Sequence, residues 1–132
     1  MKVLLDTNAY SAMLRGHPEV VTRVRRAEHV VLSTIVVGEL LFGFRAGKRL
    51  RKNLAELESF LDSPYVTLAP VTYTTADRFG RIAATLRAKG RPLPTNDIWI
   101  AAHAMETGAE LLSFDRHFDA VDGLAWVPLA PA

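Results

Sequence analysis

The chain has 132 residues, of which 49% are hydrophobic and 23% charged, the composition of a single folded domain over residues 1–132 and not of a disordered chain. It contains no cysteine, which excludes disulfide scaffolds, thiolate metal sites and cysteine nucleophiles and is compatible with the cytosol, where we expect the protein to act. The net charge is only +2, but residues 1–91 carry 15 basic and 8 acidic side chains, and residues 92–132 carry 1 and 6. This asymmetry predicts a basic surface beside an acidic site.

Local signals along the chain predict strands that alternate with helices, with no segment typical of a signal peptide or membrane span. The segments typical of short buried strands are 2–5, 30–32, 66–71, 110–114 and 125–127. Helical spacing is found over 19–26, from the cap Ser33 to Arg45, over 48–61 and 74–87, and from a cap at Thr95 or Asn96 to about Thr107. We therefore expect an α/β fold with a parallel sheet covered by helices on both faces.

Two aspartates directly follow predicted strands. Asp6 ends the apolar run Val3-Leu4-Leu5, and Asp115 follows Leu111-Leu112-Ser113-Phe114. Ligands of open α/β sheets bind at the carboxyl ends of the strands, which favours a functional site, although capping of the next helix would also explain an aspartate there.

Two further acids stand on predicted helices. Glu39 interrupts a helix that is apolar around its circumference, so we expect this helix to be mostly buried and its carboxylate to need a compensating group. The alternatives are a solvent-facing position or an ion pair. Gly38 and Gly43 would let a ligand or another backbone come close. Asp97 lies in the first turn of the predicted helix that ends near Thr107, where the helix dipole alone accounts for an acid.

Four carboxylates in one cleft cannot all ionise near pH 7 unless a cation offsets them. The four carboxylates are those of Asp6, Glu39, Asp97 and Asp115. The four histidines of the chain do not have the spacing typical of metal ligands. Because the ligands are then hard oxygens, we expect Mg²⁺ or Mn²⁺ at this site. On a protein with a basic surface, such a metal indicates hydrolysis of phosphodiester bonds.

Basic side chains gather in two stretches that are candidate phosphate contacts, although each residue alone is as typical of a solvated helix face. The first stretch holds Arg45, Lys48, Arg49, Arg51 and Lys52, and the second holds Arg78, Arg81, Arg87, Lys89 and Arg91. We expect RNA binding at the first stretch, with the second as the next candidate.

The motifs together resemble those of PIN-domain ribonucleases, specifically the VapC-type toxins of toxin–antitoxin pairs. The matching segments, spread over the full length, are Leu4-Leu5-Asp6-Thr7-Asn8, Leu32-Ser33, Gly38-Glu39-Leu40 with Gly43, Gly90-Arg91-Pro92, Asn96-Asp97, Ile100-Ala101-Ala102 and Leu111-Leu112-Ser113-Phe114-Asp115 with Phe118. The resemblance places Asp6, Glu39, Asp97 and Asp115 on the family's metal-binding acids. It places Thr7, Asn8 and Ser113 on polar positions that support them, and Ser113 stands where the family often has Thr.

The resemblance further implies a three-layer α/β/α fold, homodimers, an RNA substrate and an antitoxin whose tail enters or blocks the active site. A haloacid-dehalogenase-type phosphatase would need a second Asp at position 8, which is Asn, and a receiver domain would need a phospho-acceptor Asp and a strand-end Lys that Asp62 and Lys89 do not supply. The remaining alternative is a PIN-fold module that binds RNA or protein without cleaving it.

Overall fold

A five-stranded parallel sheet forms the centre of the computed structural model, which describes residues 1–131. The strands are β1 (Lys2–Leu5), β2 (His29–Ser33), β3 (Val66–Ala69), β4 (Glu110–Ser113) and β5 (Trp126–Pro128), in the spatial order β3-β2-β1-β4-β5. Three of these strands are almost wholly buried apolar runs, β1, β2 and β4, as expected for central strands of a parallel sheet. The α/β class predicted from the sequence is confirmed.

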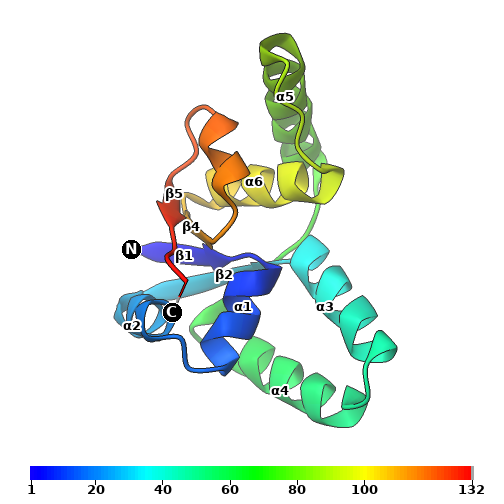
Figure 1. Ribbon diagram of the computed structural model, residues 1–132, viewed down its shortest axis with the longest axis vertical. Helices are drawn as coiled ribbons and strands as arrows, with labels where there is room; N and C mark the ends of the chain where they lie inside the picture. Colours follow the sequence, from blue (N-terminus) through cyan, green and yellow to red (C-terminus); the bar gives the residue numbers. More distant parts are fainter. Residues whose placement is uncertain (132) are drawn as a thin grey trace.

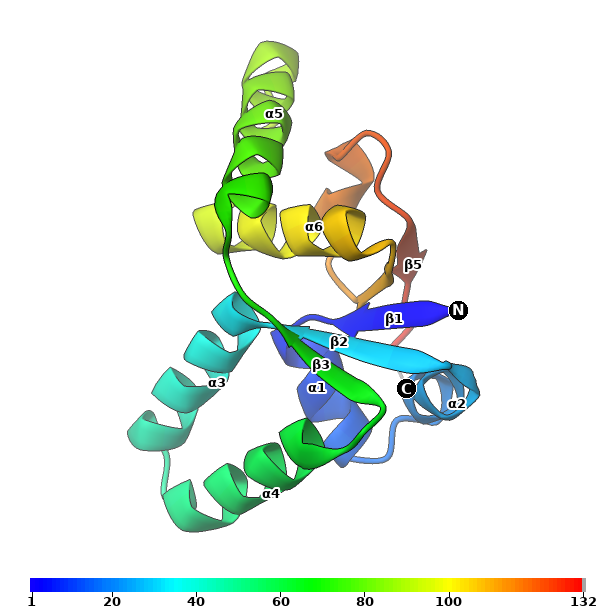
Figure 2. The same ribbon diagram turned by 180° about the vertical axis from the view of Figure 1, so that it is seen from behind.

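The helices form layers on both sides of this sheet (Figures 1 and 2). They are α1 (Thr7–Leu14), α2 (Pro18–Arg26), α3 (Thr34–Ala46), α4 (Leu50–Asp62), α5 (Tyr73–Lys89) and α6 (Thr95–Thr107), with a 3₁₀ helix η1 (Arg116–Ala120). Helices α1, α2 and α4 lie on one face, and α6 and η1 on the other, where α5 packs on α6 and extends away from the sheet (Figure 1). This is the expected three-layer arrangement. Within residues 1–131, no helix combines the length and apolar character needed to cross a membrane.

The strand order creates a switch point between β1 and β4. The chain first builds β1, β2 and β3 outward in one direction, and then returns through α6 to place β4 and β5 on the other side of β1. Leu5 pairs with Leu112, so the residues that follow the two strands emerge side by side. In parallel α/β sheets, the crevice at this point is where ligands bind.

Several element boundaries differ from the sequence-based predictions. Strand β3 ends at Ala69 and does not reach Val71, because Pro70 has no amide hydrogen to continue the ladder. Helix α4 begins at Leu50 and not at position 48. Neither Thr95 nor Asn96 caps α6: both lie inside the helix, and Pro94 occupies the cap position without a side-chain hydrogen bond. The predicted cap at Ser33 is confirmed, since its hydroxyl accepts from the Ile35 amide.

The prediction that the apolar helix α3 is mostly buried is wrong. Only Val36 and Leu40 are fully buried, and the Phe42 side chain is 78% exposed. The helix does not lie flat in a layer but leaves the carboxyl edge of the sheet beside α1, α4 and α6 (Figure 2). Nothing lies within 4 Å of the Cβ position at Gly38 or Gly43, so no other backbone segment of residues 1–131 approaches these glycines closely.

Candidate active site

The end of β1 positions Asp6. Its Oδ1 accepts from the Ala9 amide at 2.9 Å, so Asp6 caps α1, and its Oδ2 accepts from the Ser113 hydroxyl at the end of β4. The residue is only 8% exposed. Burial raises its pKa above the ordinary value, the hydrogen bonds from Ser113 and Ala9 oppose this shift, and the charges of Asp115 and Glu39 add to it. Asp6 therefore does cap the helix that follows it, and its carboxylate is at the same time close to other acidic side chains.

Glu39 reaches the same region from α3. Its Oε1 accepts from the Thr7 hydroxyl at 2.6 Å, and its Oε2 accepts from the Asn96 side-chain amide at 3.3 Å. The ion-pair alternative does not hold, because Glu39 forms no ion pair within residues 1–131. The side chain is half-buried and lines a groove beside α3. The two hydrogen bonds tie α3 to the starts of α1 and α6.

Asp97 and Asp115 complete the acidic region. Burial, followed by the charges of Asp115, Glu39 and Asp6, raises the pKa of Asp97 to about 6, while the imidazole of His117 lowers it slightly. Asp115 caps η1 by accepting from the His117 amide at 2.9 Å, and it lies 3.1 Å from the imidazole Nδ1 of the same residue. The four predicted acids therefore lie close enough to influence one another.

The basic group that contacts the acidic region in residues 1–131 is the imidazole of His117, beside Asp115. Within residues 1–131, no Lys or Arg forms an ion pair with any of the four carboxylates. Oxygen donors with uncompensated charge suit a divalent cation. In the same part of the chain, however, no three His, Asp or Glu side chains already converge as ligands of one ion. The carboxylate oxygens are chemically suited to a divalent metal ion, but some of these side chains would have to rotate before they could bind the same ion.

The predicted supporting residues fall into two groups. Thr7 and Ser113 hydrogen bond to Glu39 and Asp6, and the Ser113 hydroxyl also accepts from the Asp115 amide at 3.0 Å. Asn8 is exposed on α1 and forms no side-chain hydrogen bond in the described part of the chain. Sequence reasoning did not assign Asn96 to Glu39, and the only local signal was its position beside Asp97. It also missed His117, whose sequence signal is its place two residues after Asp115.

Comparison with known proteins identifies the family to which this chain belongs. The model of a family described as PIN domain matches residues 3–124. The chain belongs to the PIN-domain family. Its similarity to "Ribonuclease VapC2" of Haemophilus influenzae is 34% identity over 127 residues, which cover 94% of this chain and 95% of that protein.

Solved structures agree with this membership. The VapBC-1 structure from nontypeable Haemophilus influenzae matches the PIN domain with a TM-score of 0.85 and 26% identity, over 97% of this chain and 98% of the other. VapBC-5 from Mycobacterium tuberculosis, described as a member of the VapBC family of toxin–antitoxin systems, matches with a TM-score of 0.73 and 27% identity over 97% of each chain.

The two basic stretches of this PIN domain differ in whether their side chains form ion pairs. All five residues of the first stretch are exposed at the turn between α3 and α4 without ion pairs in the described structure: Arg45, Lys48, Arg49, Arg51 and Lys52. In the second stretch, three ion pairs already engage the cations: Arg81 with Asp77 at 3.0 Å, Lys89 with Asp122 at 2.5 Å and Arg91 with Asp119 at 2.8 Å. The first stretch is therefore the better candidate for phosphate contacts.

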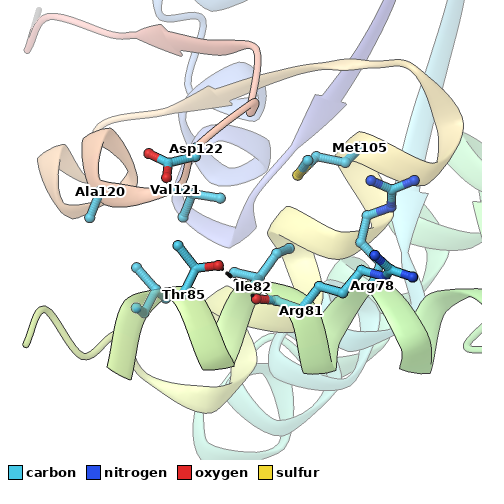
Figure 3. Close-up of a pocket in the computed structure, with 9 residues that line it drawn as sticks. Arg78, Arg81, Ile82, Thr85, Met105, Ala120, Val121 and Asp122 are labelled. Carbon is cyan, nitrogen blue, oxygen red and sulfur yellow. Dashed lines mark hydrogen bonds between the residues drawn. The ribbon is translucent and has the colours of Figure 1, made fainter. Parts of the chain in front are cut away.

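The second stretch also contributes to a small cavity away from the carboxylates (Figure 3). Arg78, Arg81 and Thr85 of α5 face Met105 of α6 and Val121 across a space of about 110 Å³, and none of the four acids lines it. The Thr85 hydroxyl donates to the Arg81 carbonyl at 3.0 Å, a bond within α5 itself. This space belongs to the packing of α5 against α6 and η1.

Proposed function

We propose that this chain is a metal-dependent endoribonuclease and the toxin of a toxin–antitoxin pair that acts in the cytoplasm. The observation that carries the proposal is the group of four mutually repelling carboxylates at the switch point of the sheet, with which no Lys or Arg is paired in residues 1–131. The similarity to a protein named ribonuclease supports RNA as the substrate.

The residues that would hold Mg²⁺ or Mn²⁺ are Asp6, Glu39, Asp97 and Asp115. Such an ion, when bound, lowers the pKa of a water molecule and stabilises negative charge on a phosphodiester. Oxygen ligands and the absence of cysteine from the sequence favour these ions over zinc.

The chain's own residues orient these acids. The Ser113 hydroxyl and the Ala9 amide fix both oxygens of Asp6, and the Thr7 hydroxyl and the Asn96 amide fix both oxygens of Glu39. Hydrogen bonds of this kind orient carboxylates that ligate a metal. Thr7, Ser113 and Asn96 are therefore positioning residues in this proposal.

The decisive experiment removes one charge at a time. Asp6→Asn and Glu39→Gln should each lower RNA cleavage by at least about 100-fold, while their folds persist, because both variants keep side-chain shape and Asn is as good a helix cap as Asp. Cleavage in Mg²⁺ and Mn²⁺ and circular dichroism are measured for both, with the exposed Glu58→Gln as control. Wild-type cleavage by either variant would contradict the assignment and favour a non-catalytic binding module.

The products distinguish the mechanism. A hydrolytic reaction at these carboxylates should leave a 5′-phosphate and a 3′-hydroxyl, and chelator should abolish it. Ribonucleases that use the RNA 2′-hydroxyl as the nucleophile commonly leave a 2′,3′-cyclic phosphate and rely on histidine acid–base pairs. Mass spectrometry of a short cleaved RNA separates the two, and a cyclic phosphate that persists in chelator would overturn the metal-dependent mechanism.

The proposed antitoxin partner fits the groove beside α3. This groove of about 680 Å³ is lined by Thr34, Ile35, Gly38, Glu39, Phe42 and Asn96, so a peptide bound there would cover one of the four acids. Phe42 offers it an exposed apolar anchor. Co-expression with the adjacent reading frame should relieve growth arrest, and Phe42→Glu should weaken that rescue.

We also propose that the chain forms a homodimer. The strongly exposed aromatic side chain of Tyr73 supports self-association, since exposed apolar surface can mark an interface. Light scattering during gel filtration of the purified protein tests this directly.

A further inference from the structure

A second groove runs along α1, and no lining residue is shared with the groove beside α3. It has a volume of about 590 Å³ and is lined by Asn8, Arg15, Gly16, His17, Pro18, Phe114 and Pro131. Asn8 and Arg15 are seven residues apart and so lie on the same side of the helix. The rest of the lining comes from residues 16–18 after α1, from Phe114 and from Pro131 near the end of the chain. We call this space the α1 groove.

None of the four acids lines the α1 groove, but two of its lining residues are close neighbours of acids in the sequence. Asn8 follows Asp6 by two residues, and Phe114 directly precedes Asp115. Arg15 lies two turns further along α1, at the far end of the same helix. A chain of nucleotides that crosses the acidic region can therefore continue into this groove.

The groove offers fixed aromatic surface. The rings of His17 and Phe114 meet edge to face, with centroids 5.3 Å apart and planes at 74°. The His17 Nε2 donates to the Ala130 carbonyl at 2.9 Å, and its Nδ1 accepts from the Val20 amide at 3.4 Å, so both ring nitrogens are engaged. Aromatic rings that are held in place but partly exposed are typical stacking surfaces for nucleic-acid bases.

Arg15 supplies an available positive charge beside these rings. Its side chain is exposed and forms no ion pair within residues 1–131. A guanidinium group presents paired donors that match phosphate oxygens. Aromatic faces next to an unpaired arginine favour a nucleotide over an apolar peptide segment.

We propose that the α1 groove binds the RNA nucleotide next to the cleaved bond, with its base against Phe114 and His17 and its phosphate at Arg15. This inference rests on the proposed ribonuclease function, which it extends from the carboxylates to the path of the substrate.

The test combines changes in the RNA with changes in the groove. Substrates carry a single abasic ribose at each position around the cleavage site, and the enzyme is wild type, Phe114→Leu, Arg15→Gln or the control Arg25→Gln, an exposed arginine outside the groove. Stacking contributes about 1–3 kcal/mol per base, so one abasic position should lower kcat/KM by about 5-fold to 140-fold. The same position should cause little further loss in Phe114→Leu, since the stacking partner is already gone.

Arg15→Gln covers the case in which Phe114→Leu fails to fold, since Arg15 is at the surface. It should raise KM several-fold with kcat little changed, whereas Arg25→Gln should change neither. If wild-type enzyme cleaves RNA but neither abasic substitution nor Arg15→Gln changes the kinetics, the groove assignment is wrong and the proposed function stands.

A binding measurement separates the two proposals. Amide resonances of the wild-type protein are followed by NMR as a five-nucleotide RNA is added in chelator, where no cleavage is expected. Shifts at Asn8, Gly16 and Phe114 support the groove even if the protein proves not to cleave RNA. Shifts confined to the groove beside α3, or none at all, would overturn the inference.

Discussion

The charge of Asp97 destabilises the fold at neutral pH, because burial and the nearby acids raise the pKa of this carboxyl to about 6 from its ordinary value of 3.8. Between these two pH values, the folded chain holds the proton more tightly than the unfolded chain does. The free energy of unfolding therefore falls as the pH rises through this window, and the full penalty is present above pH 6.

Asp97→Asn should accordingly stabilise the metal-free protein at pH 7. One pKa unit corresponds to about 1.4 kcal/mol, so the full shift corresponds to about 3 kcal/mol. Because Asp97 is only half-buried, solvent screening reduces this figure, and a gain on the order of 1–2 kcal/mol is expected at pH 7 and almost none at pH 3.5. Thermal unfolding in chelator at both pH values measures it, with Glu58→Gln as the control. A melting temperature that is equal or lower at pH 7 would show that Asp97 has a structural role.

At the scale of elements, His103 joins α6 to the ends of two strands. The side chain is fully buried, its Nε2 donates to the Pro70 carbonyl at 3.0 Å, and its Nδ1 accepts from the Ser33 hydroxyl at 2.8 Å. This arrangement assigns the proton to Nε2, since a carbonyl oxygen can only accept. His103 is therefore a structural residue at the back of the site and not a metal ligand.

His103→Leu should lower the free energy of unfolding by about 1–3 kcal/mol, because a buried hydroxyl and a carbonyl lose their partner. Urea denaturation measures this loss, and RNA cleavage well below the unfolding temperature should be retained. His29→Leu provides the comparison: His29 bonds Thr67 near the surface, where water replaces the lost contact. An equal loss from both variants would contradict this account.

Helix α3 shows what an element's own sequence leaves open. Its apolar circumference predicts burial, yet the helix leaves the edge of the sheet with Phe42 exposed. The apolar side chains of a helix indicate that its surface is buried against other protein atoms. They do not indicate whether those atoms belong to the same chain or to a partner. Glu39 was found because a charge in such a helix is unusual, whereas its partners Thr7 and Asn96 come from distant positions.

At the scale of the whole molecule, unpaired positive charge at the turn between α3 and α4 should govern the salt dependence of RNA binding. Replacing Lys48, Arg49, Arg51 and Lys52 together with Ala should reduce the slope of log affinity against log salt by up to about 3, since each phosphate contact to a single strand contributes about 0.7. The control replaces Arg81, Lys89 and Arg91, whose charges are already paired. A slope unchanged by the first set and reduced by the second would move the RNA path to α5.

The sequence by itself determined the alternation of strands and helices and the four acids, of which two follow strands, one lies at a helix start and one lies inside an apolar helix. These signals are local: the spacing of apolar residues, a capping side chain or a proline acts within a few positions of the chain. They sufficed to predict the α/β class and to select Asp6, Glu39, Asp97 and Asp115 as candidates.

Only the tertiary structure decided which of these parts meet. The order β3-β2-β1-β4-β5 sets Asp6 beside Ser113, 107 positions away, and the docking of α3 brings Glu39 to Thr7 and Asn96. The α1 groove likewise exists because Phe114 and Pro131 come from distant parts of the chain to the segment after α1, where the His17 Nε2 donates to the Ala130 carbonyl. The physical reason is that such contacts depend on how whole segments pack around a shared core. The free energy of that packing is summed over the whole molecule, and a short window of sequence does not contain it.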